Sequence, residues 1–453
     1  MDSRPGRRWS CAATLLIIAL WVRAHGALGV VPTAQAPSAP RTTAGVTAAI
    51  TSGDDEFLED LSRRSFMFFW EQADAATGIV RDRAGRDGGA SANASSREIG
   101  SIASVGFGLT GICIAAERGW LPRDQLLDRT RRTLRFFAAT SPQERGWFYH
   151  FVNLRTGARE WRSELSSIDT ALLLGGVLTV RRCFGDDPEV VRLADAIYRR
   201  VDFGWMLNGS AGVLSHGWKP ESGFLPGRWD HYCELMILYL VAIGSPTHPI
   251  PAASWRAWSR PTMTFEGVSY ISAADPLFVH QYSHAWVDFR GRLDTQGGGT
   301  DWFTNSVTAT RVHKSFCLGL SREFPGYTDN VWGITASDSR QGYTAWGGPP
   351  RHKDIDGSVV PAAAAGSLMF DPAITLPALR EMRQRFGDRI YARYGFADAF
   401  HPVDGWTNPD VIGINLGITL LSAENLRTGR VWAWFMQNPE IVGALERSGL
   451  VKR

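Results

Sequence analysis

Residues 166–182 read SSIDTALLLGGVLTVRR and are apolar on almost every side of the helix that they would form. Such a helix belongs in a protein interior, whereas a helix with one apolar face lies at a surface. Residues 101–117, SIASVGFGLTGICIAAE, predict a second interior helix, and residues 123–139 between the two predict an amphipathic helix. The alternation indicates an inner layer of helices inside an outer layer.

The same alternation recurs along the chain. Interior-type helices are expected to begin near residues 101, 166, 229, 301, 361 and 410, and amphipathic helices over 55–73, 123–139 and 188–206. The units share a pattern but no sequence identity, so they repeat in architecture alone. Six inner and six outer helices predict an all-α fold, an (α/α)6 barrel.

Turn-rich segments separate the predicted helices. They lie at 147–162, with a turn around 153–157, at 213–228 and at 262–272. Their spacing of apolar and turn residues is typical of short β-hairpins. We expect these hairpins to line a cleft at one end of the barrel.

The first 36 residues are expected to be a secretory signal peptide. Three arginines precede a short apolar run at 11–22, and Ala34-Gln35-Ala36 forms a small-x-small cleavage site. The run is too short for a typical membrane span, although an uncleaved anchor is the alternative. Residues 37–53 are predicted to be a flexible linker and residues 54–453 one domain. We expect a secreted or periplasmic monomer that does not contact the membrane once the signal is removed.

Charge and cysteine usage exclude several classes of protein. The net charge is +3, from 48 basic and 45 acidic residues, and no long basic run indicates a nucleic-acid partner. No CxxC or His-rich motif predicts a metal or another cofactor. The cysteines beyond the signal are spaced far apart within apolar stretches, so we expect buried thiols rather than bridges, at Cys113, Cys183, Cys233 and Cys317.

The 18 tryptophans are the unusual feature of the composition. Flat aromatic rings outside regular helices suit stacking against the faces of sugars. For any single tryptophan, packing in the core is the alternative. Those in loop-like stretches are Trp147, Trp161, Trp218, Trp229, Trp302, Trp332, Trp346 and Trp406.

Carboxylates recur where the interior helices are predicted to begin. Hydrolysis of a glycosidic bond needs one carboxylic acid to protonate the leaving oxygen and one carboxylate to activate water or attack the sugar. Helix starts converge at one end of such a barrel, so their acids are the candidates. They are Glu164 and Asp169 at the second helix, Asp230 and Glu234 at the third, Asp301 at the fourth and Asp410 at the last.

Helix capping is the competing explanation for these acids, above all for Asp301 and Asp410. Asp169 and Glu234 differ because apolar sequence surrounds both of them. Burial raises the pKa of a carboxyl group, which suits a general acid. The alternative is a buried carboxylate bonded to a neighbouring helix.

Two further segments are candidates for substrate binding. Residues 280–290, HQYSHAWVDFR, offer His280, Gln281 and Arg290 as hydrogen-bond donors, with an internal hydrogen-bond network as the alternative. The Gly-rich stretch 337–348 places Asp338 near Tyr343 and Trp346, which predicts a sugar subsite. Asp301 and Asn415 complete the predicted binding residues.

Six motifs resemble the glucoamylase-like domain, which contains the β-1,2-glucanases of glycoside hydrolase family 144. The resemblance covers roughly residues 55–447. The motifs are 164–174 (ELSSIDTALLL), 229–234 (WDHYCE), 244–249 (GSPTHP), 332–338 (WGITASD), 342–348 (GYTAWGG) and 423–427 (AENLR).

This resemblance implies an (α/α)6 barrel and hydrolysis of linear β-1,2-glucan with inversion at the anomeric carbon and without a metal. It maps the acidic cluster of the family onto Glu164, Asp169 and Glu234. We expect Glu164 and Glu234 to be the catalytic pair and Asp169 to position the substrate. The implied location is the bacterial periplasm or the exterior.

One departure from the family pattern concerns Asn415. Many members read Gly-Ile-Asp-Gln-Gly where this chain reads GINLG at 413–417, so an amide replaces a carboxylate. An amide can bind a sugar but cannot act as a base. A non-catalytic glycan-binding protein is therefore kept as an alternative to the hydrolase, and so is a polysaccharide lyase, because α/α barrels host these as well.

Overall fold

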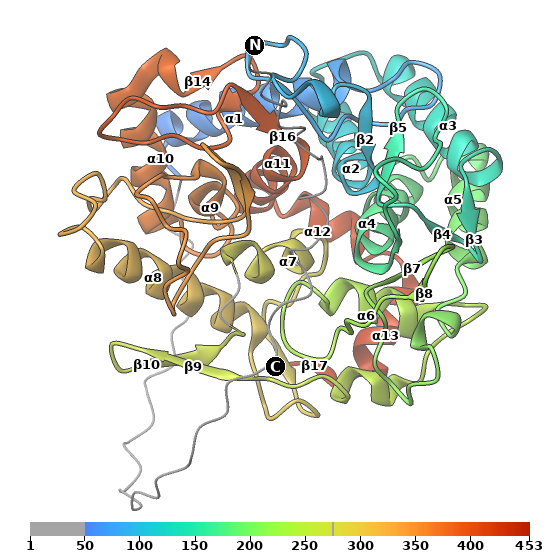
Figure 1. Cartoon of the computed structure of the whole chain (residues 1–453). Helices are drawn as coiled ribbons and strands as arrows, with labels where there is room; N and C mark the ends of the chain where they lie inside the picture. The colour runs from blue at the N-terminus through green and yellow to red at the C-terminus, as the bar shows by residue number, and fades with distance from the viewer. Residues whose placement is uncertain (1–49, 274–275) are drawn as a thin grey trace, which may run out of the picture. The chain divides into compact units, whose positions relative to one another are not determined.

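The computed structural model describes residues 50–273 and 276–453, and the predicted signal peptide with most of the predicted linker lies outside them. In this part of the chain six helices are buried on nearly every side. They are α2 (Ile102–Arg118), α4 (Ser167–Cys183), α6 (Met236–Gly244), α7 (Tyr282–Trp286), α9 (Pro361–Ala365) and α11 (Gly413–Arg427). Figure 1 shows α2, α4 and α11 side by side, and α2 packs on both α4 and α11.

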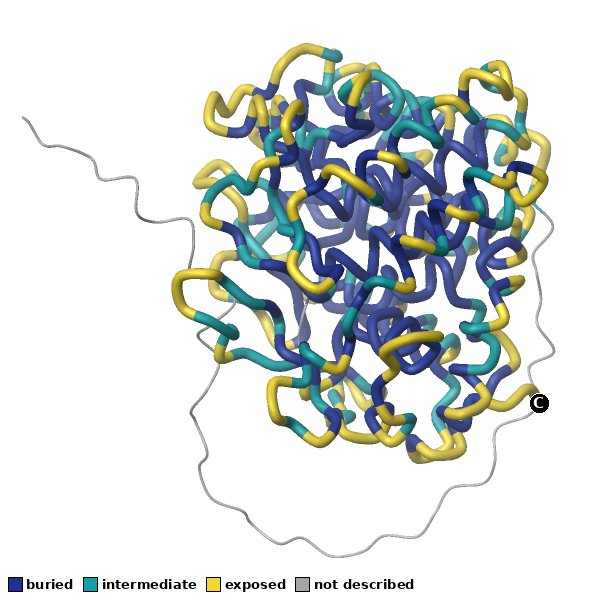
Figure 2. The backbone as a smooth tube through the Cα atoms, turned by 90° about the vertical axis from the view of Figure 1, so that its right-hand side faces the viewer, coloured by how far each residue is buried: buried dark blue, intermediate teal, exposed yellow. Residues whose placement is uncertain are grey.

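Helices with one buried face surround this inner set. They are α1 (Ser52–Glu71), α3 (Arg123–Ala139), α5 (Pro188–Arg200), α8 (Trp302–Gly319), α10 (Pro372–Phe386) and α13 (Pro439–Arg447). α1 packs on α2 and α11, α5 on α4, α13 on α6 and α10 on α9, while α12 (Arg430–Phe435) contacts α4, α7 and α11. Figure 2 shows the result, a buried interior with exposed turns around it. The predicted alternation of inner and outer helices is therefore present.

The strands are short and pair antiparallel. Most form local hairpins, as expected at 213–228 and 262–272. The pairs are β3 (Gln143–Glu144) with β4 (Trp147–Phe148), β7 (Gly217–Lys219) with β8 (Gly223–Phe224), β9 (Thr262–Phe265) with β10 (Val268–Ile271), β12 (Ser337–Ser339) with β13 (Gly342–Thr344), and β14 (Tyr391–Ala392) with β15 (Gly395–Phe396).

Other strands join distant segments just before inner helices. β2 (Ile99–Ser101) pairs with β5 (Phe151–Asn153), β6 (Leu165–Ser166) with β7, and β16 (Asp410–Ile412) with β1 (Arg83–Gly85). α2, α4 and α11 begin at the residue after β2, β6 and β16. The strands thereby hold the starts of three inner helices.

Elsewhere β11 (Arg292–Asp294) pairs with β17 (Leu450–Lys452), and 3-10 helices occupy Ala94–Ser96, Trp205–Leu207, Ala252–Arg256, Leu277–His280 and Gly387–Arg389.

The closest helix pair, α2 with α4, explains a wrong prediction about the cysteines. A side chain at Gly106 or Gly176 would collide with the backbone of the opposite helix, so the two helices approach as only glycine permits. Cys113 and Cys183 then lie with Cα atoms 6.0 Å apart and form a disulfide, instead of the expected thiols. Cys233 and Cys317 are buried and lie outside this bridge.

Three predicted helix starts also need correction. The segment 229–235 is not helical, because it bonds to residues 258–259 and 214, and α6 begins only at Met236. The helix that begins after Asp301 is amphipathic and outer, and the short α7 is the inner helix of that region. Asp410 lies in β16, where Ser91 Oγ and the Ala92 amide donate to its carboxylate, so it does not cap α11.

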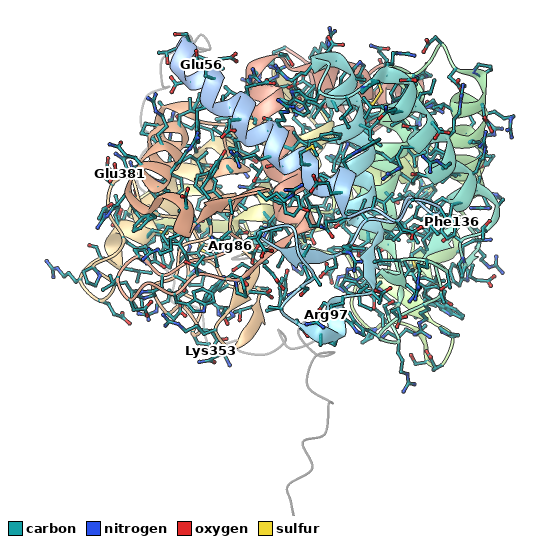
Figure 3. The ribbon with its side chains drawn as sticks, turned by 90° about the horizontal axis from the view of Figure 1, so that it is seen from above. Glu56, Arg86, Arg97, Phe136, Lys353 and Glu381 are labelled. Carbon is teal, nitrogen blue, oxygen red and sulfur yellow. A yellow bond between two sulfur atoms is a disulfide. The ribbon has the colours of Figure 1, made fainter. Side chains whose placement is uncertain are left out.

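None of the helices within the described ranges has the length and hydropathy that crossing a bilayer requires. Figure 3 shows Glu56, near the start of α1, on one side of the helices and the loop residues Arg97 and Lys353 on the other. Arg97 lies two residues before β2, which leads into α2. The loop that precedes β2 and α2 thus lies on that second side.

Candidate active site

Six carboxylates lie around the starts of the inner helices, and we call this group the acidic end. Main-chain contacts gather their segments: the Gly413 amide donates to Asp82 O (2.8 Å) and the Ile102 amide to His150 O (3.3 Å). Trp229 Nε1 donates to Ser167 Oγ (2.7 Å) and so fixes the loop before α6 against the start of α4. The members of the acidic end are Asp82, Glu164, Asp169, Glu234, Asp338 and Asp398.

His150 bridges the first two acids that the sequence predicted. Its Nδ1 lies 3.1 Å from Glu164 Oε1 and its Nε2 3.5 Å from Asp169 Oδ1. Asp169 stands in the first turn of α4, where its amide donates to Ser166 Oγ (3.2 Å) and its Oδ2 accepts from that hydroxyl (2.5 Å). This reciprocal cap fixes Asp169 and leaves its Oδ1 directed at the imidazole.

The electrostatics of this triad shift the pKa values of all three groups. Burial alone would lower the pKa of His150, but Asp169 and Glu164 raise it to about 9. Burial likewise raises the pKa of Glu164, yet the hydrogen bond and charge of His150 lower it to about 2. Burial outweighs His150 at Asp169 and raises its pKa. At neutral pH His150 is therefore a cation and Glu164 an anion.

A second cluster centres on Arg83 in β1. Its Nε donates to Asp82 Oδ2 (2.9 Å) and its Nη1 to Asp338 Oδ2 (2.5 Å). Burial would lower the pKa of Arg83, but the two carboxylates raise it, so the guanidinium stays charged. Asp338 was predicted as a binding residue, and the structure brings it to the acidic end through this ion pair.

Asp398 adjoins that cluster and makes its hydrogen bonds to amides. Its Oδ1 accepts from Asn415 Nδ2 (2.7 Å), and its Oδ2 accepts from the Asp338 amide (2.8 Å) and, more distantly, from Asn408 Nδ2 (3.5 Å). Burial first, and then the charge of Asp338, raise the pKa of Asp398 to about 7. Asn415, predicted as a substrate-binding residue, therefore lies at the acidic end with its amide directed at a carboxylate.

Glu234 is partly exposed and precedes α6 by two residues. Its carbonyl accepts from Ser283 Oγ in α7 (2.7 Å), one residue beyond the buried Tyr282. Burial raises the pKa of Tyr282 well above its ordinary value, and Tyr343, Glu234, Asp398 and Asp169 raise it further. The Tyr282 hydroxyl thus lies within the electrostatic field of acids from three inner-helix starts.

Tyr343, in the β12–β13 hairpin beside the acidic end, is 39% exposed. A cavity lined by Asp398 and Asn415 has a volume of only about 10 Å³, room for about one water molecule, so it cannot hold a sugar. Within the described ranges, no group of three or more His, Cys, Asp and Glu side chains is arranged to hold a metal ion.

Three other predicted binding residues are engaged inside the fold. His280 is buried against the Tyr232 hydroxyl (3.0 Å), and burial lowers its pKa to about 3. Gln281 donates to Ala363 O and Ser367 Oγ, and Trp346 is 1% exposed and donates to Ser337 Oγ. Trp147, Trp302 and Trp332 are equally buried, so core packing is the better explanation for these tryptophans.

Arg290 and Asp301 lie apart from the acidic end. Arg290 pairs with Asp288 (2.8 Å), stacks on Trp432 and adjoins Gly429, beyond the C-terminal end of α11. Asp301 caps α8 by accepting from the Thr304 amide (2.9 Å), which is the capping alternative considered for it.

Sequence reasoning missed His150, Asp82, Arg83, Asn408 and Asp398. His150 lies in an apolar stretch that was predicted only as a hairpin, and Asp82 and Arg83 precede the first inner helix without any periodic signal. Asp398 accepts hydrogen bonds from Asn415 and from the Asp338 amide, which lie 17 and 60 residues away in the sequence. The acid in the short loop motif ADAF at 397–400 was the only local signal.

The helical fold with carboxylates gathered at inner-helix starts is similar to that of glucoamylase-like proteins. The glucoamylase family model, Glycoamylase, matches residues 226–439. The resemblance to the glucoamylase-like domain is thereby confirmed.

Two bacterial relatives and one fungal structure refine the comparison. An exo β-1,2-glucooligosaccharide sophorohydrolase of Parabacteroides distasonis is 25% identical over 88% of this chain, which spans 58% of that relative. An endo-β-1,2-glucanase of Chitinophaga pinensis, solved with sophorotriose and glucose, has a TM-score of 0.79 and 26% identity over 88% of this chain and 98% of that chain. An endo-β-1,2-glucanase of Talaromyces funiculosus shares the fold, with a TM-score of 0.59 and 11% identity over 87% and 90% of the two chains.

Proposed function

We propose that this protein is a glycoside hydrolase that cleaves a neutral β-glucan, with linear β-1,2-glucan as the first candidate. The observation that carries the proposal is the acidic end, where six carboxylates surround the starts of the inner helices. Relatives that act on β-1,2-linked glucans support the choice of linkage. We extend the proposal to six inner and six outer helices closing as an (α/α)6 barrel, and to an exported monomer.

The acids divide by their environment into different roles. Glu234 is partly exposed at the end of its loop, so it is placed to protonate the leaving oxygen. Glu164 is held ionised by His150, and a carboxylate of such low pKa is a weak base. We therefore assign Glu164 to stabilising the positive charge that develops at the anomeric carbon. Asp169 orients His150 and positions the sugar.

A neutral substrate fits this charge distribution better than a uronate. The cations at the acidic end are already engaged, Arg83 by two carboxylates and His150 by two others. A lyase needs cationic groups to neutralise the uronate carboxylate. The geometry therefore supports hydrolysis over elimination.

A glucan panel tests the function. The protein is incubated with linear β-1,2-glucan, with β-1,3- and β-1,4-glucans and with a uronate polymer, and reducing ends, absorbance of unsaturated uronates and the NMR signals of the products are recorded. We expect reducing ends from β-1,2-glucan, with α-anomers formed first because the mechanism inverts. Glucan binding without any product would instead establish a binding protein, and unsaturated products from a uronate polymer would establish a lyase.

A further inference from the structure

The hydrogen bonds of Asp398 distinguish it from the other carboxylates of the acidic end. We propose that Asp398, positioned by Asn415, is the general base that removes a proton from the attacking water. This inference rests on the proposed hydrolase function and supplies the partner that Glu234 needs.

Neighbouring cations engage four of the other acids. Arg83 neutralises Asp82 and Asp338, and His150 holds Glu164 and lies within 3.5 Å of Asp169. Within the described ranges Asp398 forms no ion pair of 4 Å or less, and its hydrogen bonds come from the Asn415 side chain, the Asp338 amide and the Asn408 side chain. Neutral donors orient a carboxylate without removing as much of its basicity as a bound cation does.

Asp398 also keeps the capacity to bind a water molecule. An ionised carboxylate offers about four acceptor sites, and three donors face this one, the third at 3.5 Å. The Asn415 amide fixes Oδ1, because its Nδ2 also donates to Ala336 O (3.0 Å) and so cannot rotate freely. A remaining lone pair is thus held in a constant direction.

The basicity of Asp398 agrees with this role. Burial and Asp338 raise its pKa to about 7, while Asn415 and Arg83 lower it. A general base works best when its pKa lies near the working pH. The other titratable groups in its field are Tyr343 and Tyr282, and the pKa of each lies above its ordinary value.

Asp398 and Glu234 lie in two different loops, Glu234 two residues before α6 and Asp398 between β15 and β16. The charges of both raise the pKa of Tyr282, and Asp398 also raises the pKa of Tyr343 in the β12–β13 hairpin. In this proposal a sugar bound beside Tyr343 lies between the two carboxylates, as an inverting reaction requires.

The chemical step balances with these two groups. The water oxygen forms a bond to the anomeric carbon while its proton passes to Asp398. The bond from that carbon to the leaving oxygen breaks, and that oxygen takes the proton of Glu234. Both carboxyl groups return to their starting states by exchange with solvent.

The dependence of turnover on the leaving group distinguishes the proposed base, Asp398, from the proposed acid, Glu234. Asp398→Asn, Glu234→Gln and the control Asp301→Asn are assayed on linear β-1,2-glucan and on a dinitrophenyl β-glycoside of a β-1,2-linked gluco-oligosaccharide. We expect Asp398→Asn to lose about 10³-fold in kcat on both substrates with KM within about threefold. Glu234→Gln should lose turnover on the glucan but recover on the aryl glycoside, whose leaving group needs no proton. Asp301→Asn, which keeps a capping side chain, should match the wild type.

A second variant covers the case in which Asp398→Asn does not fold. Asp398→Ala is assayed with sodium azide, and we expect at least tenfold rescue with an α-glycosyl azide as the product. Retention of more than about a tenth of wild-type turnover by either Asp398 variant would overturn the inference, as would a folded Asp398→Ala that azide does not rescue. If the wild type cleaves no glucan, the proposed function fails instead, so the two failures are distinguishable.

Discussion

Asn415 Nδ2 donates a hydrogen bond of 2.7 Å to Asp398 Oδ1, joining the first turn of α11 to the segment before β16. The bond lowers the pKa of Asp398, against burial and Asp338, which raise it to about 7. Asn415→Asp removes this donor and adds a like charge, so the pKa of the pair rises. We expect the acidic limb of the kcat–pH profile to move to higher pH by at least one unit. An acidic limb that stays in place would show that Asp398 does not act as a base.

Glu234→Gln removes the proposed proton donor while keeping the size and polarity of the side chain. Turnover of linear β-1,2-glucan should fall below about 10⁻³ of the wild-type kcat, because general acid catalysis contributes up to about 10⁴-fold. Sugar affinity, measured by calorimetry with β-1,2-linked oligosaccharides, should stay within about tenfold. Near-normal turnover would remove Glu234 from the mechanism.

His150 should stabilise the folded state only within a limited pH range. The pKa of His150 in the folded protein is about 9, above the ordinary 6.5. Its contribution to the free energy of unfolding is therefore complete below pH 6.5 and is lost as the pH rises through 9. The pKa of Glu164 in the folded protein is about 2, below the ordinary 4.5. Glu164 therefore stabilises the folded state above pH 4.5, and this stabilisation is lost as the pH falls through 2. The Tm difference between the wild type and His150→Gln should therefore peak between pH 4.5 and 6.5.

Thermal unfolding at several pH values checks this prediction. The exposed His231, paired with Asp230, offers a matched control, since an exposed pair contributes little and His231→Gln should change Tm only slightly. A Tm difference for His150→Gln that stays constant up to pH 10 would contradict the assigned ion pairs.

Much of the helical fold was predictable because its inner helices are apolar on nearly every side. α3 begins and ends where the sequence predicted, and α2 and α4 lie within one residue of the expected ranges. The short α7 was not found, because five residues are too few to show a period. The segment 229–235 was wrongly predicted as helix because its apolar residues pack in a loop whose backbone bonds elsewhere.

The candidate site was predictable only where acids directly adjoin a helix start. Glu164 and Asp169 satisfy that condition, and their position relative to α4 follows from local capping. His150 and Asp398 join the acidic end through tertiary contacts, which leave no periodic trace in the sequence. The prediction that loop tryptophans stack on sugars is not supported for Trp147, Trp302, Trp332 and Trp346, which are buried in the core.

The Cys113–Cys183 disulfide ties α2 to the last residue of α4, at the end of that helix opposite Asp169, and spans 70 residues of chain. In the chain-entropy model, closing a loop of that length stabilises a protein by about 4 kcal/mol. The Cys113→Ser/Cys183→Ser double variant should therefore lose several degrees in Tm. The control is a reductant, which should lower the Tm of the wild type and leave the double variant unchanged; equal Tm values for the two proteins without reductant would show that the bridge contributes nothing to stability.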